Sequence, residues 1–163
     1  MGSPILVAIA AVNVLLAAIS IGVAWISASS AGTTFSLSIW QMGSVANYFG
    51  NDNIVVTQVF ICLTLVFAVG GLVGSAVQVS GSESAKNAGF GCHLVTAFCS
   101  IVSWAVYLNL FIDMPQQQFV QFYAAGFGLQ VVVSILALVA TVLSCASGSA
   151  PKGDYGAPPQ KEP

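Results

Sequence analysis

Residues 54–79 read IVVTQVFICLTLVFAVGGLVGSAVQV, an apolar run without a single Lys, Arg, Asp or Glu. A helix needs about 20 such residues to cross a hydrocarbon core that is about 30 Å thick. Backbone groups in lipid must be hydrogen-bonded within a helix or a closed barrel, and the sequence lacks the alternating ten-residue segments of a barrel. This run therefore predicts a transmembrane helix.

Three further runs have the same character, at residues 4–26, 90–112 and 120–145. Together the four runs predict an all-α membrane fold, a left-handed four-helix bundle formed by residues 1–147. Residues 148–163 are rich in Gly, Pro and polar side chains and are expected to form a disordered tail.

The composition of the chain agrees with this assignment. Of the 163 residues, 57% are hydrophobic and 5% are charged, whereas a soluble domain carries about 25% charged residues. The mean hydropathy is +0.93. The formal net charge is -2, with three Lys and Arg residues in total, so the chain lacks the cations of a nucleic-acid-binding surface. A soluble globular domain and a nucleic-acid partner are both excluded.

The lysines indicate an orientation. Lys86, Lys152 and Lys161 all fall on one side of a four-helix topology, together with both termini. The positive-inside rule places that side in the cytoplasm. The long loop at residues 27–53 then faces outward, and we expect the protein in the plasma membrane or a surface-derived membrane.

The loop at residues 27–53 contains a pattern with a period of two. Phe35, Leu37 and Ile39 alternate with two serines and Trp40. This alternation predicts a short β-strand on the outer membrane surface. We expect Phe35, Leu37, Ile39 and Trp40 to form an interaction surface.

Small residues spaced four apart recur in three of the runs. This spacing lets helix backbones approach closely in a membrane. It predicts packing within the bundle, with a dimer or partner interface as the alternative. The residues concerned are Ala18, Gly22, Gly70, Gly71, Gly74, Ala124 and Gly128.

The polar residues at depth within the runs are sparse. Asn13, Asn109 and Gln130 are each expected to face the bundle interior or a neighbouring subunit, because an unpaired polar group in lipid is costly. Trp25, at the outer end of the first run, is expected in the aromatic belt at headgroup level.

The chain offers little acid–base or metal chemistry. His93 is the only histidine, and Asp113 lies about 30 Å away along the same predicted helix. His93 and its neighbour Cys92 supply two ligands at most, fewer than a metal site needs. We therefore expect no catalytic residue, no metal site and no cofactor beyond bound lipids. Cys92 and Cys145 lie near one membrane face and are candidates for reversible palmitoylation.

Two short motifs carry a family resemblance. Residues 35–41, FSLSIWQ, look like the aromatic-Ser-Leu-Trp loop signature of the amastins, and residues 122–129, FYAAGFGL, look like the opening of their last helix. The chain thus resembles the amastins within the claudin-like tetraspan superfamily. The family's two loop cysteines are absent, and Gln41 stands where the family has Gly. MARVEL-type tetraspans are the alternative family.

These observations predict a non-enzymatic tetraspan with a structural or organising role at a cell-surface membrane. Its partners are expected to be membrane lipids and other membrane proteins, or itself through small-residue helix faces. The alternative is an accessory subunit of a larger channel, respiratory or photosynthetic complex. A third possibility is an oligomeric pore, with Asp52 and Asp113 supplying external negative charge.

Overall fold

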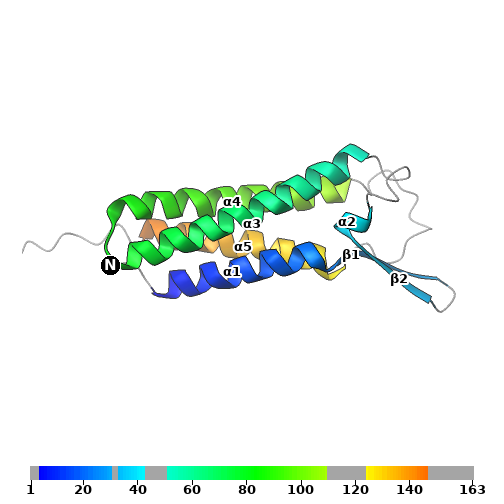
Figure 1. Cartoon of the computed structure of the whole chain (residues 1–163), viewed down its shortest axis with the longest axis horizontal. Coiled ribbons are helices and arrows are strands. Elements are labelled where there is room, and N and C mark those ends of the chain that lie inside the picture. Colours follow the sequence, from blue (N-terminus) through cyan, green and yellow to red (C-terminus); the bar gives the residue numbers. More distant parts are fainter. Residues whose placement is uncertain (1–3, 31–32, 43–50, 110–123, 147–163) are drawn as a thin grey trace, which may run out of the picture.

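The computed structural model describes residues 4–30, 33–42, 51–109 and 124–146. The first connection carries a small antiparallel sheet and a short helix, and the long helices form the body of the protein (Figure 1). In chain order the elements are α1 (Pro4–Gly22), β1 (Ala24–Ser30), β2 (Thr33–Ser38), α2 (Ile39–Met42), α3 (Asn51–Val79), α4 (Glu83–Asn109) and α5 (Ala125–Ala146).

The long helices pack in the cyclic order α1, α3, α4, α5. Helix α1 packs against α3 and α5, and α4 packs against the same two helices. The β1–β2 sheet projects from one end of this bundle, called here the sheet end (Figure 1). The opposite end, called the turn end, carries the turn between α3 and α4. The predicted all-α four-helix fold is confirmed.

The distribution of side chains is that of a membrane protein. Within the described residues, four helices are long and apolar enough to cross a membrane. Large apolar side chains point outward from them, among them Val66, Phe98 and Val142, each more than 60% exposed. Buried positions are instead filled largely by Ala, Ser, Thr and Gly. Because this arrangement suits lipid rather than water, the chain is an integral membrane protein.

The first helix ends earlier than predicted, at Gly22 rather than residue 26. Trp25 and Ile26 belong to β1 and are buried, so Trp25 does not lie in an aromatic belt. The Trp25 Nε1 group donates a hydrogen bond to the carbonyl of Ser20 at 2.8 Å. This bond satisfies one of the carbonyl groups left open at the helix end, and the chain leaves the helix there.

The fourth helix element, α4, begins at Glu83, seven residues before the predicted start. Residues 80–89, which separate the second and third apolar runs and were expected to form a cytoplasmic loop, are therefore largely helix, and Lys86 lies near the start of α4. Gly81 makes the turn with φ of 98°, a conformation that glycine adopts without strain. The amide of Ala85 donates to the Ser82 hydroxyl at 3.4 Å, which is the geometry of an N-cap.

The predicted strand is present, and it has a partner that the sequence did not reveal. β2 pairs antiparallel with β1, in a register that sets Ile26 opposite Leu37. An irregularity between Ala24 and Ile26 bends β1 where it leaves the bundle. Ile39 does not continue the strand but begins α2.

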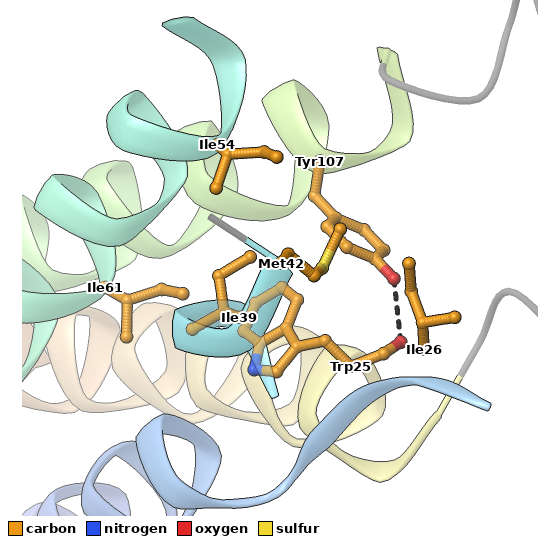
Figure 2. Close-up of a cluster of buried hydrophobic side chains, with 7 residues drawn as sticks. All are labelled: Trp25, Ile26, Ile39, Met42, Ile54, Ile61 and Tyr107. Carbon is orange, nitrogen blue, oxygen red and sulfur yellow. Dashed lines mark hydrogen bonds between the residues drawn. The ribbon is translucent and has the colours of Figure 1, made fainter. Parts of the chain in front are cut away.

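A buried apolar cluster lies where the sheet meets the helices (Figure 2). The Trp25 and Tyr107 rings meet edge to face, with centroids 5.0 Å apart. Ile39 and Met42 of α2 pack between this aromatic pair and α3 (Figure 2). The cluster consists of Trp25, Ile26, Ile39, Met42, Ile54, Ile61 and Tyr107.

Candidate functional site

The sheet is fastened to the bundle through the backbone carbonyl of Trp25. The Tyr107 hydroxyl of α4 donates to this carbonyl at 2.7 Å (Figure 2). The amide of Ala124, just before α5, donates to the same oxygen at 3.3 Å. A Cβ on Gly126 would overlap the Trp25 indole, so the ring lies directly on the α5 backbone. β1 is therefore held by α1, α4 and α5 together.

Helix α2 is fastened by a second set of hydrogen bonds. Trp40 Nε1 donates to the Ile21 carbonyl of α1 at 3.1 Å. Gln58 Nε2 of α3 donates to the Ile39 carbonyl at 3.0 Å. Since these contacts reach α1 and α3, α2 bridges the two helices at the sheet end.

The strand-to-helix junction is a capping box. The Gln41 amide donates to the Ser38 hydroxyl at 3.4 Å, and the Ser38 amide donates to Gln41 Oε1 at 3.0 Å. This is the reciprocal pattern of a Ser-x-x-Gln start. The Ser-x-x-Gln spacing can be recognised in the sequence, and the capping box explains why the strand stops at Ser38.

The predicted interaction surface divides into buried and exposed parts. Ile39 is fully buried, so a partner cannot reach it. Leu37 is half-buried against the apolar cluster, and Phe35 lies in β2. Trp40 is 45% exposed, and Ser36 is exposed on the strand. Among residues 36–42, the exposed side chains are therefore those of Ser36, Trp40 and Gln41.

Gln130 of α5 organises a buried polar layer in the sheet-end half of the bundle, which we call the Gln130 layer. Its Oε1 accepts from the Ser20 hydroxyl of α1 at 3.0 Å, and its Nε2 donates to the Thr64 hydroxyl of α3 at 3.3 Å. The Ser100 hydroxyl of α4 donates to its backbone carbonyl at 2.8 Å. One residue thus hydrogen-bonds to all three other spanning helices. The predicted burial of Gln130 is confirmed, while its three partners were not foreseen.

The glycines of α3 lie against α4. A Cβ on Gly74 would be 2.6 Å from the Cα of Gly89, and one on Gly70 would be 3.0 Å from the Cys92 sulfur. A Cβ on Gly71 would be 2.6 Å from the His93 ring. These three glycines pack within the bundle, as predicted.

Most of the small residues of α1 and α5 that were predicted to pack within the bundle do not do so. Ala18 and Gly22 are exposed, and Gly128 is exposed with no atom within 4 Å of an added Cβ. Ala124 is half-buried beside β1. The inward stripe of α1 is instead Leu6, Ala10, Asn13, Ala17 and Ser20. The prediction of internal packing is therefore wrong for Ala18, Gly22 and Gly128.

The remaining predicted residues lie apart from one another. Asn13 is buried as predicted, whereas Asn109 is exposed at the end of α4. Cys145 is exposed near the end of α5, and Cys92 is half-buried against α3. Asp113, Lys152 and Lys161 lie outside the described residues, as does the predicted tail.

A shallow apolar groove of about 350 Å³ runs along the outer face of α3, beside Trp40. On a membrane-spanning helix such a groove faces lipid chains. It is lined by Trp40, Val55, Gln58, Val59, Cys62, Leu63 and Val66.

No three His, Cys, Asp or Glu side chains among the described residues lie close enough to hold a metal ion. No family model, no curated protein and no solved structure matches this chain.

Proposed function

We propose that this integral membrane protein is a non-enzymatic tetraspan that organises other membrane proteins, or copies of itself, at a cell-surface membrane. The observation that carries the proposal is the set of hydrogen bonds that hold the sheet and α2 against the bundle. Hydrogen bonds to the Trp25, Ile39 and Ile21 carbonyls come from side chains of α4, α3 and α2 itself. A small extramembrane element bound this firmly is suited to presenting a fixed surface.

The sheet offers an edge on which a partner can add a strand. Among the described residues, β1 and β2 pair only with each other. Within the described ranges each strand therefore has one edge without a strand partner, and on β1 the Trp25 carbonyl at that end is already bonded to Tyr107 and Ala124. An unpaired strand edge is a template for pairing with another chain. A sheet of two strands is marginal by itself and gains stability from a third.

The position of the described lysine supports an outward-facing sheet. Lys86 lies near the start of α4, at the turn end, and the sheet is at the other end of the bundle. The positive-inside rule then favours a cytoplasmic turn end and an extracellular sheet. The resemblance to amastins and claudin-like tetraspans supports the same surface role, since its loop motif at residues 35–41 spans the β2–α2 junction.

The hydroxyls of the buried threonines support a non-enzymatic role. Thr57, Thr96 and Thr141 each donate to a carbonyl one turn back in the same helix. Hydroxyls committed in this way serve the helices that carry them.

An accessory subunit of a larger channel, respiratory or photosynthetic complex is the second candidate. It is favoured by the exposure of Ala18, Gly22 and Gly128, since small residues on a lipid-facing surface allow a partner helix to approach closely.

The test is the native mass of the protein extracted in mild detergent, with identification of what co-purifies. Ser36→Lys places a charge on the exposed strand, which blocks edge pairing. We expect at least a tenfold loss of association in Ser36→Lys and none in the matched control Ser84→Lys at the turn end. A monomeric wild type contradicts both candidates. An assembly that survives Ser36→Lys but is lost in Gly22→Leu supports the accessory subunit.

A further inference from the structure

The apolar groove on the outer face of α3 has the size of a binding site for a small molecule. Its volume of about 350 Å³ lies within the usual range of ligand pockets, about 300–1,000 Å³. Trp40 of α2 forms one side of the groove, and a stripe of α3 from Val55 to Val66 forms the rest. Because α3 spans the membrane, the groove opens to lipid rather than to water.

The groove is about as long as one leaflet is deep. Val55 and Val66 are eleven residues apart, which is about 16.5 Å along a helix. Half of a hydrocarbon core of about 30 Å is about 15 Å. The groove ends at Val66, although α3 continues to Val79. This extent fits a lipid in the leaflet at the sheet end, whereas a partner's transmembrane helix would follow α3 through both leaflets.

The wall of the groove is stiff. Val55, Val59 and Val66 are β-branched, and a valine in a helix has one strongly preferred χ1 rotamer. The Trp40 indole is held by its hydrogen bond to the Ile21 carbonyl at 3.1 Å. A rigid ligand loses little conformational freedom on binding such a wall, whereas a flexible acyl chain has to be ordered. The wall therefore favours a rigid ring system over an acyl chain.

Gln58 provides a hydrogen-bond acceptor in the groove. Its Nε2 donates to the Ile39 carbonyl at 3.0 Å, which fixes the orientation of the amide. No group among the described residues donates to its Oε1. An amide oxygen of this kind accepts a hydrogen bond from a hydroxyl. A sterol hydroxyl can donate to it, whereas the glycerol esters of a phospholipid only accept.

The depth of Gln58 suits the hydroxyl of a sterol. Asp52 is exposed at the start of α3, so its charge lies at headgroup level or beyond it. Gln58 follows six residues later, about 9 Å along the helix. The headgroup region on each side of a bilayer is about 5–8 Å thick. Gln58 therefore lies near the boundary between the headgroups and the hydrocarbon, with the apolar stripe extending inward from it.

We propose that the groove binds a membrane sterol, with the fused rings against Trp40 and the valine stripe and the hydroxyl donating to Gln58 Oε1. The rings match the stiff wall, the hydroxyl matches the acceptor, and the length of the molecule matches one leaflet. The site lies on α2 and α3 and not on the strand edges, so it does not depend on the proposed function.

The test uses the full-length protein in phosphatidylcholine nanodiscs with a photoreactive cholesterol analogue, and mass spectrometry identifies the labelled residues. Phospholipid is present in excess, so labelling in the groove reports selection of the sterol. We expect labelling at Trp40 and within residues 55–66, and competition by unlabelled cholestanol. Cholestanone has the same rings with a carbonyl in place of the hydroxyl. It should compete about three- to tenfold less well, because one hydrogen bond is lost.

A pair of cysteine variants tests the location. Cys62 is exposed and lines the groove, so Cys62→Phe fills the groove and should reduce labelling roughly tenfold by removing contact with the wall. Cys145→Phe, the same change at an exposed cysteine of α5, should leave labelling unchanged. Labelling spread over the outer faces of all four spanning helices overturns the proposal. Equal competition by cholestanol and cholestanone overturns it without any variant, as does undiminished labelling in folded Cys62→Phe.

Discussion

Gly74 of α3 and Gly128 of α5 are both glycines in apolar helices, yet one is packed against a neighbouring helix and the other is exposed. Gly74 faces the Gly89 backbone, and Gly128 faces outward. The spacing rule that singled out both residues describes distance along a helix and says nothing about direction. At the residue scale, therefore, direction determines what a glycine does.

The first prediction compares these two glycines. A Cβ on Gly74 would lie 2.6 Å from the Gly89 Cα, and backbone cannot move aside without separating α3 from α4. Gly74→Ala should lower the free energy of unfolding by about 1–3 kcal/mol. Gly128→Ala adds a Cβ to open space and should cost nothing. Thermal unfolding in the same detergent measures both, and equal losses would contradict the packing of α3 on α4.

At the scale of elements, the sheet end shows how the bundle shapes the first connection. Hydropathy carries the first apolar run to residue 26, but the helix ends at Gly22. Beyond that point Trp25 caps the helix with its indole and packs on α5 and Tyr107. The apolar character of Trp25 and Ile26 thus reflects burial in a sheet-end cluster rather than membrane crossing.

The second prediction concerns the fastening of β1. Tyr107→Phe removes the hydroxyl that donates to the Trp25 carbonyl and leaves the aromatic pair in place. We expect a loss of about 0.5–1.5 kcal/mol, the usual net value of one hydrogen bond. Hydrogen exchange should become faster at the amides of β1 and stay unchanged in the middle of α3, which serves as the internal control. Unchanged exchange in β1 would show that Tyr107 does not hold the strand.

At the scale of the whole molecule, the bundle has an inverted distribution of polarity. Its interior contains polar side chains, including the Gln130 layer and the buried side chains of Asn13 and His93. Its outer face carries large apolar side chains. Since lipid and apolar side chains are equally apolar, packing of small residues and interhelical hydrogen bonds hold such a bundle together.

The third prediction tests the topology of the entire chain. Ser36 is exposed at the sheet end and Ser84 is exposed at the turn end. In a variant whose four cysteines are replaced, Ser36→Cys should react with a membrane-impermeant thiol reagent added outside intact cells. Ser84→Cys should react only after permeabilisation. Labelling of both positions from the same side would contradict the four-span arrangement, and an exchange of their sides would reverse the orientation alone.

Several features of the candidate site could be predicted from the sequence, and others could not. Burial of Asn13 and Gln130 follows from the cost of an unpaired polar group in lipid. The capping box at Ser38 joins two residues that are three positions apart, so its pattern can be recognised in the sequence. By contrast, Ser20, Thr64 and Ser100 resemble many other small hydroxyl residues in the chain. Their role appears only when four helices bring them to one glutamine.

Hydropathy and residue period are properties of neighbouring residues, so they were enough to predict four membrane-spanning helices and a strand after the first. They could not predict which helix faces turn inward, where α1 ends or what pairs with β2. Those outcomes depend on contacts between residues far apart in the chain, such as Tyr107 with Trp25 and Gln130 with Ser20. Local propensity cannot encode such contacts, since it is the same before and after the helices assemble.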